Sequence, residues 1–212
     1  MFNGKIQLND FFDSDFMDTA LQLYGLTKKK SYPGLQQVLM NYKNRLKKSS
    51  RFPGFFNFGE TFTQMIKIND NNFYVVEWSI PVAKKAIKNY DLPLCKFSLD
   101  EMIHLVDQKY INKSYLSIAL INNSPIFIAS YPPAVTKNKF LIIDGNHRVI
   151  SKHQNGQKEI IGHMFEPYQH LQAMVNDVYR TLYKIHFNYY RIASYVGGVI
   201  SRKELDETLY PL

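Results

Sequence analysis

Cysteine is almost absent from this chain, because Cys95 is the single one among 212 residues. An internal disulfide is therefore excluded, and a reducing cytoplasm is the expected setting. No apolar run approaches the roughly 20 residues that a helix needs to cross a bilayer. The first residues also lack the basic region and apolar stretch of a secretory signal. We therefore expect a cytoplasmic protein with no membrane contact.

Acidic residues are missing from a long interval near the N-terminus. Between Asp18 and Glu60 the chain has no aspartate or glutamate but eight lysines and arginines, and its formal net charge is +8. Such a basic surface suits a nucleic acid or an acidic protein. The residues expected to bind such a partner are Lys43, Arg45, Lys47, Lys48 and Arg51. A solvated helix face, with cations near the helix C-terminus, is the open alternative.

Apolar spacing and turn residues predict a mixture of helices and strands. In the first 90 residues we expect helices at 16–23, 33–48 and 81–88, and a β-hairpin of strands at 61–68 and 73–80. Further on we expect helices at 99–106, 112–122 and 147–154, strands at 125–129, 140–143 and 159–165, one or two helices at 168–196, and a short last helix. Ser14, Ser98 and Ser201 are the expected N-caps.

This order of elements favours an α+β fold. We divide the chain into three segments. Residues 1–90 form a basic N-terminal elaboration of two helices and a hairpin, 91–167 form the core, and 168–212 form C-terminal helices that pack on that core.

The most informative stretch is an apolar strand that ends abruptly in an acid and a glycine. Residues 141–143 are Leu-Ile-Ile, and Asp144-Gly145-Asn146-His147-Arg148 follow at the start of a predicted helix. The unpaired backbone N–H groups and positive dipole of a helix N-terminus favour an anion. This stretch, called the 144–148 turn below, is therefore a predicted phosphate site.

The surrounding elements resemble those of the ParB/sulfiredoxin superfamily. Its members show a proline–isoleucine strand, a loop, and an apolar strand ending in a D-G-x-H-R motif that starts a helix. Pro125-Ile126, Ile142-Ile143 and the 144–148 turn occupy those places in that order. The resemblance covers about a third of the chain, near residues 92–165. It implies a mixed sheet flanked by helices, with a nucleotide phosphate held at the turn.

The resemblance also implies a role for each residue of the motif. Gly145 permits close backbone approach, while Asn146, His147 and Arg148 contact phosphate oxygens of a nucleoside triphosphate, ATP or CTP. Arginine suits this role because its guanidinium binds phosphate in a bidentate manner. Asp144 and His147 are the catalytic candidates: Asp144 can hold Mg²⁺ or orient a nucleophile, and His147 can shuttle a proton.

Departures from the family pattern narrow this prediction. A sulfiredoxin needs a cysteine where this chain has Asn146, so that activity is not expected. Partition proteins carry an E-N-x-x-R motif on a later helix, and a weaker echo stands at 176–180. There Asn176 or Asp177 can help bind a metal and Arg180 a phosphate, with a polar helix face as the alternative. The residues after 165 are too few for a complete partition protein.

Three functions stay open. The first is chemistry on phosphate at the 144–148 turn, either NTP hydrolysis or phosphoryl transfer of an ATPase or kinase type, with a nucleic acid as a further substrate, as in a nuclease. The second is a non-catalytic DNA- or RNA-binding or regulatory protein that uses the basic segment 28–51. The third is an interaction protein that keeps the fold without the activity. Stand-alone domains of this family often occur on mobile elements. The sequence does not fix the oligomeric state.

Overall fold

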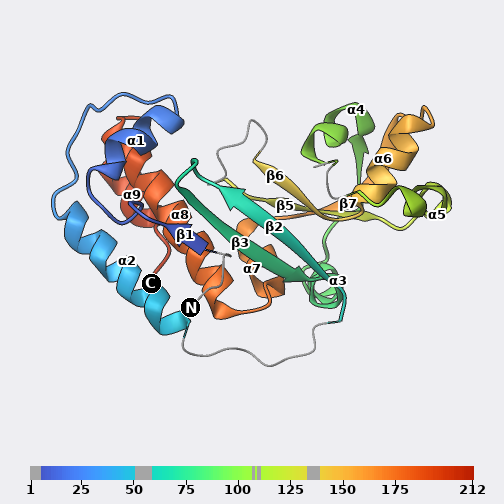
Figure 1. Ribbon diagram of the computed structural model, residues 1–212, viewed down its shortest axis with the longest axis horizontal. Coiled ribbons are helices and arrows are strands. Elements are labelled where there is room, and N and C mark those ends of the chain that lie inside the picture. Colours follow the sequence, from blue (N-terminus) through green and yellow to red (C-terminus); the bar gives the residue numbers. More distant parts are fainter. Residues whose placement is uncertain (1–5, 51–58, 107, 109–110, 133–138) are drawn as a thin grey trace.

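A computed structural model of the chain describes residues 6–50, 59–106, 108, 111–132 and 139–212, and it shows an α+β fold (Figure 1). The strands are β1 Ile6–Leu8, β2 Thr61–Lys67, β3 Asn72–Ser79, β4 Cys95–Ser98, β5 Ile126–Ser130, β6 Phe140–Asp144 and β7 Glu159–Phe165. The helices are α1 Phe16–Leu23, α2 Leu35–Ser49, α3 Ile80–Asn89, α4 Leu99–Met102, α5 Leu116–Ile121, α6 Asn146–Gln154, α7 Pro167–Ala173, α8 Asp177–Val196 and α9 Arg202–Thr208.

One sheet comes from the first third of the chain and has the order β1-β3-β2. Its strands are antiparallel, and β2 pairs with β3 along its whole length, from Thr61 opposite Ser79 to Lys67 opposite Phe73. The predicted hairpin is therefore confirmed to within one residue at each end. β2 is an edge strand of this sheet, so one side of it is free to face another part of the molecule.

A second, mixed sheet has the order β4-β7-β5-β6. β5 runs parallel to β7, while the other two pairings are antiparallel. The predicted strands at 125–129, 140–143 and 159–165 are confirmed, the last with identical bounds. β6 is an edge strand and leads directly into α6, so the 144–148 turn stands at the margin of this sheet (Figure 1).

The C-terminal helices lie mainly against the N-terminal part of the chain. The predicted helical region 168–196 is two helices, and α7 contacts β5, β7, α3 and β3. The longer α8 packs instead on α1, α2 and β3, with α9 beside it. One apolar cluster accordingly runs from Phe11 to Leu205, and a smaller one lies among α4, α6 and the second sheet. We expected these helices on the 91–167 core, and α7 has contacts there.

The predicted N-cap position is confirmed at Ser98 and Ser201, and the predicted capping box at Ser201, whereas Ser98 makes no side-chain capping hydrogen bond. Ser201 accepts from the Glu204 N–H and donates its own N–H to the Glu204 carboxylate, which is the predicted capping box. Ser98 precedes a helix of only four residues, because the chain continues as a 3₁₀ turn at Ile103–Leu105 and becomes extended at Val106. Ser14 is not a cap, since α1 starts one residue later, after Asp15.

A buried polar network joins the first sheet to α8. The Tyr74 hydroxyl lies 2.8 Å from the Tyr131 hydroxyl and 2.7 Å from Nδ1 of His186, whose Nε2 lies 3.3 Å from the Tyr24 hydroxyl. Burial lowers the pKa of His186 to about 3. It lowers the pKa of His170 on α7 to about 4, although the Ser130 carbonyl opposes that shift. Both imidazoles are therefore neutral at pH 7.

None of the helices in the described ranges combines the length and the apolar character that crossing a bilayer requires.

Candidate functional site

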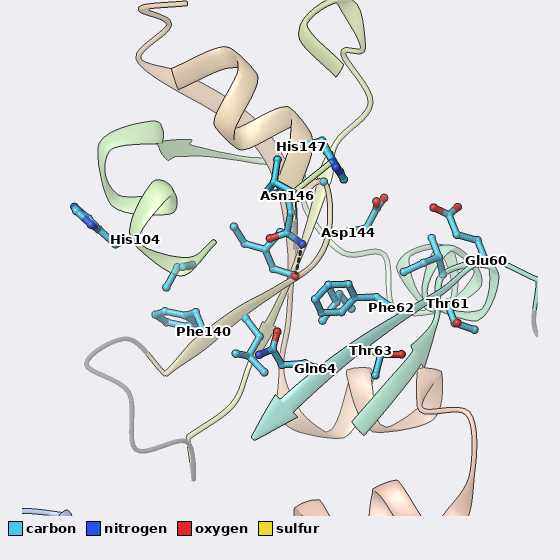
Figure 2. A pocket seen from close by; sticks show the side chains of 17 residues that line it. Glu60, Thr61, Phe62, Thr63, Gln64, His104, Phe140, Asp144, Asn146 and His147 are labelled. Atoms are coloured by element: carbon cyan, nitrogen blue, oxygen red, sulfur yellow. Dashed lines mark hydrogen bonds between the residues drawn. The ribbon is translucent and has the colours of Figure 1, made fainter. Parts of the chain in front are cut away.

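A cavity of about 840 Å³ separates the edge strands of the two sheets. β2 forms one wall, and β6 with the start of α6 forms the other (Figure 2). The described residues that line it are Glu60, Thr61, Phe62, Thr63, Gln64, Ile80, His104, Leu105, Ile111, Phe140, Leu141, Ile142, Ile143, Asp144, Gly145, Asn146 and His147. Four of the five residues of the predicted motif thus reach the cavity.

Gly145 is required by the geometry of the turn. Its φ is +101°, a conformation that side chains disfavour, and it is the N-cap of α6. A Cβ here would lie 2.4 Å from Cγ2 of Ile126 and 2.9 Å from Nη2 of Arg148. The missing side chain lets β6 turn straight into α6 while β5 packs closely behind. The cavity wall at this point is therefore bare backbone.

The start of α6 offers hydrogen-bond donors. The first helical bond runs from the Val149 N–H to the Gly145 carbonyl at 3.0 Å, so the three preceding N–H groups have no acceptor within the helix. No side chain caps this end. The Asn146 amide donates backwards to the Ile142 carbonyl at 3.1 Å, which anchors the turn to β6. An anion in the cavity would meet both free donors and the positive end of the helix dipole.

His147 is held in one orientation at the cavity rim. Its Nε2 accepts from the Asn112 backbone N–H at 3.1 Å, and its ring lies edge-on to Tyr115 at 6.0 Å between centroids. Because Nε2 accepts, the proton of the neutral imidazole belongs on Nδ1. That N–H is then a further donor at the rim. The histidine can give a hydrogen bond to a ligand or accept a proton after losing the Asn112 contact.

Arg148 turns away from the cavity that its four neighbours line. Its Nη2 donates to Oδ2 of Asp144 at 3.0 Å and to the Pro125 carbonyl at 3.2 Å. The two charged side chains are only 11% and 19% exposed, respectively, so the pair is largely shielded from water. Among the described residues, no partner accepts from the buried Arg148 Nε. Arg148 is therefore placed to orient the Asp144 carboxylate rather than to contact a ligand.

The cavity is acidic at the end near the turn. Glu60 and Asp144 both line it, and Figure 2 shows their carboxylates on the same side. No lysine or arginine is found among the described lining residues. Within the described parts of the chain, no three His, Cys, Asp or Glu side chains form a group that could hold a metal. One or two carboxylates are nevertheless what Mg²⁺ uses when substrate phosphates supply other ligands, so these two acids fit that cation.

The echo motif at 176–180 lies elsewhere. Asn176 is the N-cap of α8 and accepts from the Tyr179 N–H at 3.0 Å. Arg180 donates from Nε to the Leu171 carbonyl at 3.0 Å and from Nη2 to the Met174 carbonyl at 2.7 Å. Its burial lowers the pKa of the guanidinium, opposed by the charge of Asp177. These residues stabilise the α7–α8 junction, and none of them lines the cavity.

The predicted basic cluster is divided by the helix that carries it. The buried stripe of α2 consists of Leu39, Tyr42, Leu46 and Ser49. At about 100° per residue, Arg45 and Lys48 fall on one flank of this stripe, and Lys43 and Lys47 fall on the other. Arg51 lies outside the described residues.

Sequence reasoning missed the β2 wall of the cavity. Phe62, Thr63 and Gln64 were predicted only as strand residues, and no spacing links them to the 144–148 turn. Their place in the site results from the docking of one sheet on the other, a contact between residues some 80 positions apart. His104 and Phe140 were also missed: they were predicted only as helix and strand residues, and they line the cavity from the 3₁₀ turn Ile103–Leu105 and from the start of β6.

Comparison of this chain with models of known protein families, with characterised proteins and with solved structures found no match. Membership of the ParB/sulfiredoxin superfamily therefore stays a prediction that rests on the motif and the order of elements around it.

Proposed function

We propose that the cavity binds a nucleoside triphosphate, ATP or CTP, together with Mg²⁺, and that the protein performs chemistry on its phosphate. The observation that carries this proposal is the start of α6, which no side chain caps and whose residues Gly145, Asn146 and His147 line a cavity large enough for such a ligand. A volume of about 840 Å³ lies within the range of about 300–1,000 Å³ typical of small-molecule sites.

The lining is polar at one end and apolar over much of the remainder. Asp144, Asn146 and His147 gather at the turn, whereas Phe62, Leu105 and Phe140 contribute apolar surface. A nucleotide has the same division, since its phosphates need donors and its base offers a flat face for aromatic contact. The phosphates would lie at the α6 N-terminus and the base against the apolar walls.

The charge of the lining accounts for a requirement for magnesium. A triphosphate is strongly anionic, and the described lining offers it two carboxylates and no side-chain cation other than histidine. Direct approach of the phosphates to Glu60 and Asp144 would be repulsive. Mg²⁺ held by Asp144, with Glu60 beside it, would reverse that repulsion. Arg148 keeps the Asp144 carboxylate oriented for this role.

The first test is a thermal shift assay with each common nucleoside triphosphate in the presence of Mg²⁺. A nucleotide at about one hundred times its Kd adds about 2.7 kcal/mol, which for a protein of this size raises Tm by about 5–10 °C. We expect this shift with ATP or CTP and its loss when EDTA removes Mg²⁺. The absence of a shift with every nucleotide would contradict the proposal.

Two histidines of α6 provide a matched pair of variants. His147 lines the cavity, whereas His153 lies near the other end of the helix and pairs with Asp100 at 3.2 Å. We expect His147→Ala to weaken nucleotide binding about tenfold, since a hydrogen bond to a charged group contributes about 1.5–3 kcal/mol. His153→Ala should leave the Kd unchanged. Isothermal titration measures both, and equal effects would place the nucleotide elsewhere.

Chemistry is tested separately from binding. Release of inorganic phosphate from the nucleotide that binds, measured for the wild type and for Asp144→Asn, reports hydrolysis. Asparagine keeps an oxygen for the Arg148 hydrogen bond but removes the negative charge. We expect turnover in the wild type and its loss in the variant. If the protein binds the nucleotide but neither hydrolyses it nor transfers its phosphoryl group to an added acceptor molecule, the proposal of catalysis is contradicted. The cavity would then serve only to sense the nucleotide.

A further inference from the structure

A second recess, of about 360 Å³, lies between α2 and α8. Its described lining residues are Arg45, Lys48, Asp177, Arg180, Thr181, Lys184, Pro211 and Leu212. It shares no residue with the cavity beside the 144–148 turn. We call it the basic recess, because four of its side chains are cationic and one is acidic.

The cations of the basic recess come from two distant parts of the sequence. Arg45 and Lys48 lie one turn apart on α2, and Arg180 and Lys184 lie one turn apart on α8. The packing of α2 on α8, through residues such as Tyr42 and Asn188, brings the two pairs to the same hollow. Four like charges repel one another, so this arrangement favours a ligand that supplies negative charge.

Few of these charges are neutralised within the protein. Asp177 lies 3.4 Å from Arg45, in a pair whose side chains are 42% and 49% exposed, so water screens it. Lys184 lies 5.9 Å from the centre of the Tyr210 ring. Within the described part of the chain, the side-chain ammonium of Lys48 forms neither an ion pair nor a hydrogen bond. Arg180, which also lines the recess, is held in place by two carbonyls.

We infer that the basic recess binds the phosphodiester backbone of a nucleic acid strand. Lysine and arginine from two helices are suited to successive phosphates, and such contacts need no particular base sequence. The half-buried ring of Tyr210 does not line the recess; it lies under Lys184 and packs edge-on to Phe187 at 5.0 Å, which holds that lysine in place. A strand is favoured over a single free phosphate because the cations are spread over two helices.

The two flanks of α2 allow a controlled test. Arg45→Gln/Lys48→Gln removes two charges from the basic recess, while Lys43→Gln/Lys47→Gln removes two charges from the opposite flank of the same helix. Both double variants change the net charge equally. These side chains are not buried, so both proteins should fold, and their circular dichroism and Tm check this.

Binding is measured by fluorescence anisotropy with labelled single-stranded DNA and RNA of about 16 nucleotides, between about 50 and 200 mM salt. We expect the recess variant to bind about tenfold more weakly, and the slope of log K against log salt to fall by about 1.4, or 0.7 for each lost phosphate contact. The opposite-flank variant should change the affinity less than about twofold. Similar binding of DNA and RNA is expected, because phosphate is common to both.

Three results would overturn the inference. Equal losses in the two double variants would show diffuse attraction by net charge. No oligonucleotide binding at the lowest salt would exclude a nucleic acid. Binding of vesicles rich in phosphatidylserine, or of inorganic phosphate followed by isothermal titration, in a protein that binds no oligonucleotide would assign the recess to a different phosphate source. None of these results bears on nucleotide binding in the cavity, which involves other residues.

Discussion

The cavity beside α6 and the basic recess between α2 and α8 offer an anion different chemistry. In the cavity the donors are backbone N–H groups and His147, and the described part of its lining includes two carboxylates but no lysine or arginine. In the recess the donors are four charged side chains. The first arrangement fits a compact ligand that arrives with a divalent cation, and the second fits an extended polyanion. The two proposals thus predict phosphate sites that respond differently to magnesium and to salt.

The rigidity of the two regions also differs. The cavity depends on a glycine with no room for a side chain and on an ion pair shielded from water. On its α2 side the recess depends on Arg45 and Lys48, which are not buried. Substitutions near the cavity should therefore affect stability, whereas substitutions of Arg45 and Lys48 should affect binding alone.

The largest expected effect comes from the two glycines that bracket α6. Gly145→Ala places a Cβ 2.4 Å from Ile126 at a φ of +101°. Backbone strain and overpacking together should cost about 3–5 kcal/mol, or about 6–20 °C in Tm. Gly156 also has a positive φ, of +75°, but has open space around it, so Gly156→Ala should cost about 1 kcal/mol. Equal shifts in Tm would show that the close approach at Gly145 is not maintained in solution.

Acidification should destabilise the protein through two buried histidines, His170 on α7 and His186 on α8, which belong to neither site. The unfolded chain binds a proton at each histidine below about pH 6.5, but in the folded chain burial holds the pKa of His170 at about 4 and that of His186 at about 3. Stability is therefore lost as pH falls below 6.5. At pH 5 the loss is about 2 kcal/mol for each histidine, or about 4 kcal/mol together.

Urea unfolding followed by the fluorescence of Trp78, the single tryptophan, measures this loss. The Trp78 indole lies 3.4 Å from His170, so the probe is local to the network. His186→Gln should reduce the difference in unfolding free energy between pH 7 and pH 5 by about half. A difference unchanged in this variant would show that His186 is already protonated in the folded protein.

A smaller effect separates a shielded ion pair from an exposed one. Asp144–Arg148 and Arg202–Asp206 are both spaced four residues apart, at 3.0 and 2.9 Å. Asp144→Ala leaves the Arg148 charge without its partner and should cost about 3 kcal/mol. Asp206→Ala removes a pair that is about half exposed and should cost less than about 1 kcal/mol. Chemical denaturation compares them, and similar costs would show that water reaches Arg148.

Much of this fold could be predicted from local sequence. The strand at 159–165, the hairpin, the Ser201 capping box and the passage from β6 into α6 all follow from patterns of a few residues. β1 and β4 could not be predicted, because strands of three and four residues carry little signal and exist through their pairing with β3 and β7.

The site was predictable only in part. The 144–148 turn is local, so its residues could be named from the sequence. The direction of Arg148 could not, because it depends on the Pro125 carbonyl supplied by another strand. The β2 wall of the cavity and the division of the basic segment between two flanks of α2 likewise arise from tertiary packing.

The most direct test of the central claim is an NMR titration of ¹⁵N-labelled protein with the Mg²⁺ complex of the nucleotide that raises Tm. We predict that the largest chemical-shift changes occur at the backbone amides of Gly145, Asn146, His147 and Arg148, with smaller ones along β2. Amides near Arg45, Lys48 and Lys184 should stay unchanged. Shifts concentrated in α2 and α8, with none at 145–148, would contradict the claim that the start of α6 binds the nucleotide phosphates.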